Sequence, residues 1–168
     1  MGMSVTISAA TGQDAEQILK LQYLCFQSEA ALYGDYRIDP LVQTLESLRE
    51  EVAADCVVVA RLGDEVVGSV RGRIAEDGSA AIDRLCVHPR LQGHGIGARL
   101  LRAAEAALAA ERGATLFRLH AGPRGEGSLR LYRREGYRTV DVSQGADGVT
   151  GIVLEKPAKP AGDYAATA

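Results

Sequence analysis

The chain has 168 residues, of which 46% are hydrophobic and 24% are charged, and its formal net charge at pH 7 is -3. This length and composition are typical of a single globular domain with its own hydrophobic core. A nucleic-acid-binding domain normally carries a surplus of basic residues, and no hydrophobic run here approaches the length of a membrane span. We therefore expect a cytoplasmic protein whose partners include neither nucleic acid nor a membrane.

Seven strands are predicted from alternating apolar residues, β-branched runs and turn signals. They are expected at residues 5–10, 56–60, 66–74, 80–87, 115–120, 137–142 and 149–155. Short turns at Gly63-Asp64 and Asp77-Gly78 join the second, third and fourth of these strands. These three strands are therefore predicted to form an antiparallel meander.

Four helices are predicted from apolar residues spaced three and four apart. They are expected at residues 15–26, 41–52, 98–112 and 128–135. Residues 27–40 are less regular and are expected to be only partly helical. Residues 156–168 are rich in Pro and Ala and are expected to form a disordered tail, so the predicted domain spans residues 4–155.

The three cysteines, Cys25, Cys56 and Cys86, lie in apolar runs without C-x-x-C spacing. Their odd number argues against a disulfide framework, and buried, reduced thiols are expected. The histidines show no metal-ligand spacing with acids or cysteines, so no metal site is predicted.

A glycine-rich stretch separates the strand that ends at Val87 from the helix that begins at Ala98. Gly93, Gly95 and Gly97 leave a run of backbone N–H groups with little side-chain cover. These groups lie at a predicted helix N-terminus, where the macrodipole is positive. The stretch therefore predicts a binding site for a phosphorylated ligand.

Three phosphate-binding patterns compete for this stretch. A P-loop is rejected because no Lys follows Gly97. A dinucleotide fingerprint fits the letters from Gly93 to Ala98, but Pro89 and several polar residues separate these glycines from the strand. The acidic residue that would contact a ribose about 20 residues later is also missing. A dinucleotide-binding enzyme is kept as a distant alternative.

The third pattern fits best: Gln92-x-x-Gly95-x-Gly97 resembles the acetyl-CoA signature of the GNAT N-acetyltransferase superfamily. The preceding segment Leu85-Cys86-Val87-His88-Pro89 resembles the central strand of that family, and the predicted order β-α-α-β-β-β-α-β-α-β-β is similar to its element order. The resemblance implies an α/β (α+β) single-domain acyl-CoA N-acyltransferase fold, with a mixed, mostly antiparallel sheet of about seven strands flanked by about four helices.

The resemblance also implies that acetyl-CoA is the cosubstrate and donates an acetyl group directly to an amine in a ternary complex. The pyrophosphate is expected on the helix N-terminus, and the pantetheine arm beside the strand as an added strand would lie. The cofactor-binding residues are then expected to be Leu85, Cys86, Val87, Gln92, Gly93, His94, Gly95, Ile96, Gly97 and Ala98.

A second segment, from Ser128 to Tyr137, resembles the Leu-Tyr-x-x-x-Gly-Phe/Tyr segment of the same family, in which the helical tyrosine reaches the cofactor sulfur. Carried over, Tyr132 is the candidate general acid, because a phenol can protonate a departing thiolate. The loop before it reads Arg124-Gly125-Glu126-Gly127 where the family often has an Asn. Contacts through the backbone, or a mobile loop, are therefore expected there.

The base that deprotonates the incoming amine has two main candidates. Asp83 lies two residues before Leu85 and is expected on the same strand face. His120 ends the fifth predicted strand, and histidine is the residue type that most often serves as a general base near neutral pH. Glu29 and Asp35 are further possibilities, either as bases or as ligands of a cationic substrate.

The acceptor is expected near the first two helices, where the substrate-binding residues are predicted to be Glu29, Tyr33, Asp35 and Tyr36. Aromatic rings and carboxylates together favour a small cationic amine. A peptide or protein amine remains the alternative acceptor, and a non-catalytic acyl-CoA sensor remains the alternative class of protein. A homodimer is one assembly that we consider.

Overall fold

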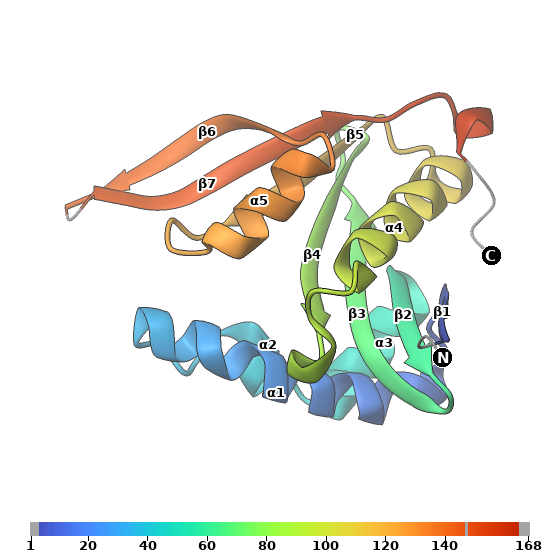
Figure 1. Ribbon diagram of the computed structural model, residues 1–168. Helices are drawn as coiled ribbons and strands as arrows, with labels where there is room; N and C mark the ends of the chain where they lie inside the picture. The colour runs from blue at the N-terminus through green and yellow to red at the C-terminus, as the bar shows by residue number, and fades with distance from the viewer. Residues whose placement is uncertain (1–3, 147, 165–168) are drawn as a thin grey trace.

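The computed structural model describes residues 4–146 and 148–164, which form one mixed sheet with helices on both faces (Figure 1). The sheet has seven strands in the order β1-β2-β3-β4-β5-β7-β6. Neighbouring strands are antiparallel, except that β4 and β5 run parallel. The strands are β1 (Val5–Ala9), β2 (Cys56–Leu62), β3 (Glu65–Ile74), β4 (Ser79–Val87), β5 (Leu116–Ala121), β6 (Arg138–Gly145) and β7 (Gly148–Pro157). The α-helices of the described residues are α1 (Ala15–Tyr33), α2 (Asp39–Val42), α3 (Leu45–Ala54), α4 (Ile96–Arg112) and α5 (Glu126–Arg134). The predicted fold class is confirmed.

Two hydrophobic clusters hold the helices against opposite faces of the sheet. Successive residues of β2 alternate between the clusters, as the two-residue period of a strand requires. Val57 and Val59 pack on the side of α1 and α3, where Ile18 and Leu48 are buried, whereas Val58 packs on the side of α4 and α5. The α1–α3 face and the α4–α5 face are the two sides of the sheet on which the site is built.

Helix α4 lies close to β3 because that strand carries glycines where the helix crosses it. A Cβ at Gly72 would lie 2.6 Å from Cδ1 of Leu108, and a Cβ at Gly68 would lie 2.8 Å from Cδ1 of Leu100. Only residues without side chains allow this close approach. The contact fixes the position of α4 and therefore of its N-terminus, which follows the glycine-rich loop.

Two of the predicted helix boundaries are wrong. The first helix continues past residue 26 to Tyr33, because the good helix formers of residues 29–32 extend it, and Gly34 ends it with a left-handed φ of 66°. The helix predicted at residues 41–52 is α3, which starts at Leu45 because Thr44 caps it by accepting a hydrogen bond from N of Ser47.

The predicted disordered tail starts too early. β7 pairs with β5 as far as Pro157, and residues 161–163 form a short 3₁₀ helix. The ring of Tyr164 lies edge-on to the buried ring of Phe117, with 6.5 Å between the ring centroids. These contacts order the chain beyond residue 155, and residues 165–168 lie outside the described residues.

Candidate active site

The sheet opens between β4 and β5. The two strands pair only where residues 79–81 run beside residues 116–118, and they then diverge (Figure 1). Among the residues that the structure describes, positions 82–87 of β4 have no strand partner on the β5 side. A cleft of about 830 Å³ lies at this opening. The backbone groups along such an open strand edge are free to pair with an extended ligand.

The cleft brings together residues that are far apart in the sequence. Its walls come from α1, α2, β3, β4, β5 and α5. The predicted site residues in its lining are Glu29, Tyr33, Asp83, Leu85, His120 and Tyr132. Asp35 and Tyr36 are not part of the lining: Asp35 accepts a hydrogen bond from N of Arg37 just after α1, and Tyr36 is 58% exposed.

Strand β4 contains a β-bulge where it leaves β5. Cys86 pairs with Ser69 and Asp83 pairs with Arg71, so two residues of β4 lie opposite one residue of β3. Arg84, inside the bulge, has a φ of 54° and is the one non-glycine residue with positive φ in the described parts of the chain. The bulge turns two consecutive side chains, those of Asp83 and Arg84, toward the α1–α3 face.

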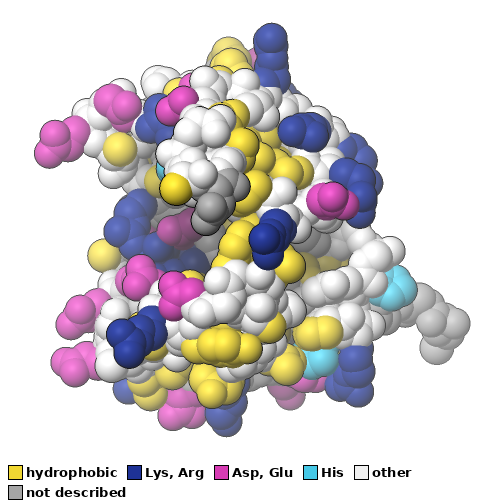
Figure 2. All heavy atoms as spheres, turned by 90° about the vertical axis from the view of Figure 1, so that its left-hand side faces the viewer, with side chains coloured by type: hydrophobic (Ala, Val, Ile, Leu, Met, Phe, Trp, Pro, Cys, Tyr) yellow, Lys and Arg dark blue, Asp and Glu magenta, His cyan; other side chains and the backbone are white. Residues whose placement is uncertain are grey.

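These two side chains belong to a network of charges. Asp83 accepts two hydrogen bonds from the guanidinium of Arg71, whose Nη1 also donates to Oε1 of Glu51 at 2.6 Å. Nη1 of Arg84 donates to Oε1 of Gln43 at 2.6 Å and to Oε2 of Glu51 at 3.2 Å. Arg71 is only 8% exposed, so these partners replace the hydration that its charge has lost. Figure 2 shows basic and acidic side chains together in the hollow of the face that it presents.

Tyr132 reaches the cleft from α5. It is buried together with Leu129, three residues earlier on the same side of the helix. Burial raises the pKa of the Tyr132 phenol to about 12, and the charges of Glu29 and Asp83 add to the increase. The phenol therefore keeps its proton throughout the neutral range and can donate it.

The three candidate bases differ in how they are held. Both carboxylate oxygens of Asp83 accept hydrogen bonds from Arg71, so both are already engaged by a guanidinium. Glu29 lines the cleft and has no ion pair among the described residues. The cleft walls desolvate its carboxyl and raise its pKa. His120, near the end of β5, is exposed and lines the same cleft.

A contact between α1 and the loop after β5 joins two walls of the cleft. Oη of Tyr33 accepts a hydrogen bond from N of Arg124 at 3.0 Å, and Nη1 of Arg124 donates to O of Leu32 at 3.3 Å. The Tyr33 ring lies directly over Gly122, where any Cβ would overlap it. We call this contact the Tyr33 clasp. Leu32, Tyr33 and Gly122 line the cleft, so the clasp forms part of its wall.

The glycine-rich loop leads into α4 as an exposed turn. Gly93 and Gly95 have φ of 84° and 78°, in the left-handed region that disfavours a side chain. Gly95 is the N-cap, and no side chain caps the helix. The N–H groups of residues 96–98 therefore have no partner inside α4, and they lie at the positive end of its dipole. This is the geometry of an anion-binding site.

Several of the predicted cofactor residues also have structural contacts of their own. Nε2 of Gln92 donates to O of Val87 at 3.3 Å and so ties the loop back to the end of β4. Ile96 is 3% exposed in the cluster on the α4–α5 face, and Cys86 is 6% exposed in the cluster on the opposite face. The buried side chains of Ile96 and Cys86 are therefore not available to a ligand.

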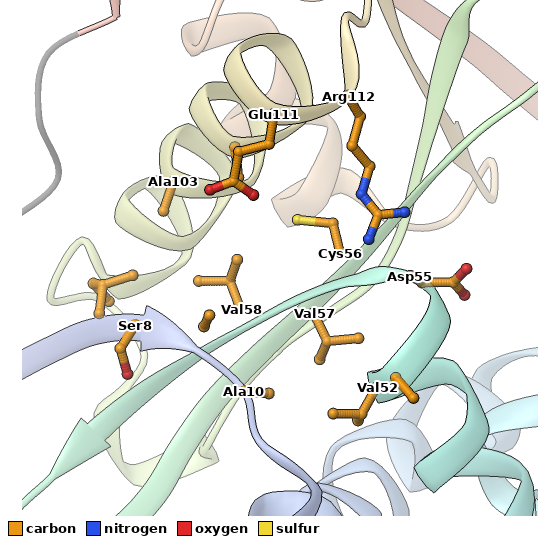
Figure 3. A pocket seen from close by; sticks show the side chains of 14 residues that line it. Ser8, Ala10, Val52, Asp55, Cys56, Val57, Val58, Ala103, Glu111 and Arg112 are labelled. Carbon is orange, nitrogen blue, oxygen red and sulfur yellow. The ribbon is translucent and has the colours of Figure 1, made fainter.

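A smaller pocket of about 320 Å³ lies between β1, β2, the end of α3 and the C-terminal half of α4 (Figure 3). In Figure 3, Glu111 and Arg112 extend from α4 toward Cys56 of β2. Arg112 donates to O of Ala54 at 2.9 Å, and burial raises the pKa of the Cys56 thiol. A thiol with a raised pKa is a weak nucleophile. None of the predicted site residues lines this pocket.

Sequence reasoning missed the bulge and the two residues that accept hydrogen bonds from its Arg84, namely Gln43 and Glu51. One signal was available: Ile82 and Leu85, which pack in the same cluster, are separated by the two charged residues Asp83 and Arg84. A spacing of three inside a strand breaks its two-residue period, and such a break is typical of a bulge.

Among the described residues, 4–146 and 148–164, no helix combines the length and the hydrophobicity needed to cross a bilayer. No group of three or more histidine, cysteine or carboxylate side chains there is arranged to hold a metal ion.

Solved structures share this fold at low sequence identity. The PaiA N-acetyltransferase from Thermoplasma acidophilum in complex with coenzyme A is 19% identical, with a TM-score of 0.75 over 92% of this chain and 99% of that chain. The ribosomal-protein-S18-alanine N-acetyltransferase from Escherichia coli is 15% identical, with a TM-score of 0.72 over 97% of this chain and 99% of that chain. The aminoglycoside 6'-acetyltransferase type Ii is 23% identical, with a TM-score of 0.73 over 92% of this chain and 97% of that chain.

No curated protein matches the sequence significantly. The family model of the acetyltransferase (GNAT) family matches residues 15–137, which include β4, the glycine-rich loop and Tyr132. This match confirms the predicted class of enzyme, an acetyl-CoA-dependent N-acetyltransferase. The chain belongs to the acetyltransferase (GNAT) family.

Proposed function

We propose that the protein transfers the acetyl group of acetyl-CoA directly to the primary amine of a small, cationic acceptor bound in the same cleft. One observation carries the proposal. The open edge of β4, the protonated phenol of Tyr132 and the unpaired carboxylate of Glu29 meet in a single cleft. Acetyl transfer to an amine requires a binding site for the acyl donor, a proton donor and a proton acceptor, which correspond to these three features in that order.

The residues of the chain fit acetyl-CoA at two places. The uncapped N-terminus of α4, after Gly93 and Gly95, suits the pyrophosphate. The edge of β4 around residues 85–87, which has no strand partner on the β5 side, suits the amide groups of the pantetheine arm, which can lie along it as a strand would. When bound, acetyl-CoA supplies an activated acetyl thioester.

Each polar group of the cleft then has a distinct part. A backbone N–H at the bulge can stabilise negative charge on the acyl oxygen. Tyr132 donates its proton to the departing thiolate. We assign deprotonation of the incoming ammonium to Glu29, because its carboxylate is unpaired and its raised pKa makes it a better base. His120 is the second candidate, and Asp83 the third because Arg71 holds it.

The free carboxylates of the cleft favour a cation as the acceptor, whereas the two guanidiniums in its lining, those of Arg71 and Arg84, are already paired. Glu29 and Asp39 line it with no ion pair among the described residues, and the rings of Phe26 and Tyr33 lie beside them. Carboxylates and aromatic faces together attract an ammonium group. The Tyr33 clasp joins two walls and leaves less room for a long peptide.

Neighbours of similar fold are named for different acceptors. One is an aminoglycoside acetyltransferase and another is a ribosomal-protein-alanine acetyltransferase. The fold alone therefore does not select the acceptor. A peptide amine is the second candidate acceptor for this chain, favoured by the exposed rings of Tyr23 and Tyr36 beside the cleft helices.

The test is a panel of small polyamines, aminoglycosides, amino acids and short peptides, assayed by the release of free CoA thiol. We expect turnover on small cationic amines, with kcat/KM rising as the pH passes through the raised pKa of Glu29. The Glu29→Gln variant should lose this acid limb, whereas Asp39→Asn should keep it and raise the acceptor KM. Tight binding of acetyl-CoA without turnover of any amine would instead indicate an acyl-CoA sensor.

A further inference from the structure

The bulge in β4 depends on a residue in a disfavoured conformation. Arg84 has a φ of 54°. The left-handed region is unfavourable for an L-residue because Cβ approaches the following carbonyl oxygen. Such a conformation persists only where the surrounding structure holds it. Leu85, the next residue, lies on the open edge of the strand, so the direction of that edge beyond the bulge follows from the conformation of Arg84.

The side chain of Arg84 is held by two elements outside the sheet. Gln43 directly follows α2 and Glu51 lies on α3, and both accept hydrogen bonds from Nη1 of Arg84. The side chain of Arg84 is 11% exposed, and burial together with the charge of Arg71 lowers the pKa of its guanidinium. The two acceptors therefore compensate a charge that has little water around it.

The two anchors are themselves fixed. Oε1 of Glu51 accepts from Nη1 of Arg71 at 2.6 Å, so one carboxylate bridges β3 and β4. Gln43 accepts a hydrogen bond from Nε2 of the buried Gln22 at 3.1 Å and donates one to Oγ of Ser47. Arg84 is thereby tied to α1, to α3 and to the segment between α2 and α3.

We propose that Arg84 is a positioning residue: its guanidinium, anchored on Gln43 and Glu51, holds the β4 bulge so that the backbone at Leu85 faces the cleft. The inference rests on the proposed function, because the orientation of the open edge affects catalysis only if acetyl-CoA binds along it. Arg84 acts through the backbone of Leu85 and not by contact with the acceptor. The alternative is an ordinary buried ion pair, with a bulge that holds its shape without it.

The test separates the effect of the Arg84 hydrogen bonds to Gln43 and Glu51 from the effect of the positive φ at that position. Glycine adopts positive φ without cost, so Arg84→Gly keeps the backbone conformation accessible and removes only the anchor. The matched control is Arg61→Met, because Arg61 makes two hydrogen bonds of 2.6 Å to Asp14, outside the cleft. Both variants lose one partly buried ion pair, but only the first touches β4.

Two readouts decide the proposal. Hydrogen exchange of the backbone at residues 82–87 should become faster in Arg84→Gly and stay unchanged in Arg61→Met. In Arg84→Gly, kcat should fall about 10- to 100-fold while the KM for acetyl-CoA changes by less than about two-fold, because a small misplacement costs rate while the phosphate site is untouched. Arg84→Lys should recover part of the lost rate.

The remaining outcomes of these experiments also decide for or against the proposal. A folded Arg84→Gly protein with wild-type exchange, or with wild-type kcat, overturns the proposal. If Arg84→Gly does not fold, Glu51→Gln provides the same two readouts. If the wild-type protein turns over no amine, the proposed function fails, and hydrogen exchange alone decides whether Arg84 holds the bulge.

Discussion

Removing the hydroxyl of Tyr132 tests the assignment of the general acid. Tyr132 is 8% exposed, and burial raises its pKa to about 12. The group is therefore protonated at neutral pH, and its protonation does not limit the reaction below about pH 11. A positioned acid of this kind contributes about 100- to 10,000-fold to the rate. We expect Tyr132→Phe to lower kcat by that factor.

Binding should be nearly unaffected by the same change. The phenol lies in the cleft, whereas the anion site at the N-terminus of α4 lies outside its lining. The Kd of acetyl-CoA, measured by calorimetry, should therefore stay within about three-fold of wild type, a difference of less than about 1 kcal/mol. The kinetic assay is the release of CoA thiol with a small polyamine as acceptor.

Tyr137 provides the matched control. It lies beside Tyr132, with 6.3 Å between the ring centroids, but it does not line the cleft. Its buried Oη donates to Oε2 of Glu105 at 2.7 Å. Tyr137→Phe should therefore cost about 1–3 kcal/mol of stability and leave kcat unchanged. A kcat for Tyr132→Phe within about two-fold of wild type would refute the acid assignment, because general acid catalysis is worth far more than that.

Three further predictions follow from the loop, the clasp and a distant ion pair. Gly95→Glu should weaken acetyl-CoA binding at least about ten-fold by calorimetry, because it places a negative charge at the anion site. The control is Gly113→Glu, at a similar left-handed φ at the other end of α4, which should leave acetyl-CoA binding unchanged. Gly122→Ala should displace the ring of Tyr33 and raise the acceptor KM in the thiol assay while the KM for acetyl-CoA stays the same; unchanged acceptor kinetics would exclude a role for the clasp. The hydrogen bond from Arg61 lowers the pKa of Asp14 in the folded protein. The Asp14 carboxylate therefore stabilises the fold fully above its unfolded pKa of about 3.9. This stabilisation is lost as the pH falls through the lower pKa that Asp14 has in the folded protein. Urea unfolding of Asp14→Asn should show a weaker loss of stability in acid than wild type, and an equal loss would contradict this linkage.

The parts of the fold that follow from local sequence were predictable. The turns at Gly63-Asp64 and Asp77-Gly78 specify a meander because their chemistry suits tight hairpin turns. The glycines before α4 specify an uncapped helix start, since residues without side chains leave its N–H groups bare. Tyr132 was identified by its motif, and the structure places it in the cleft.

The parts that depend on contacts between distant segments were not predictable. Glu51 meets Arg84 across 33 positions of sequence, and no local pattern predicts that pair. The Tyr33 clasp joins residues 91 positions apart. Asp35 was expected in the acceptor site because of its charge, but α1 continues to Tyr33, and Asp35 then falls in the turn that follows it.

The central claim is that this cleft moves an acetyl group from acetyl-CoA to a small cationic amine. The most direct measurement is mass spectrometry of an amine panel after incubation with acetyl-CoA and either the wild-type protein or Tyr132→Phe. The account predicts that a small cationic amine gains one acetyl group in step with CoA release, and far more slowly with the variant. Acetyl-CoA that binds while every amine stays unmodified, or equal product from both proteins, would contradict it.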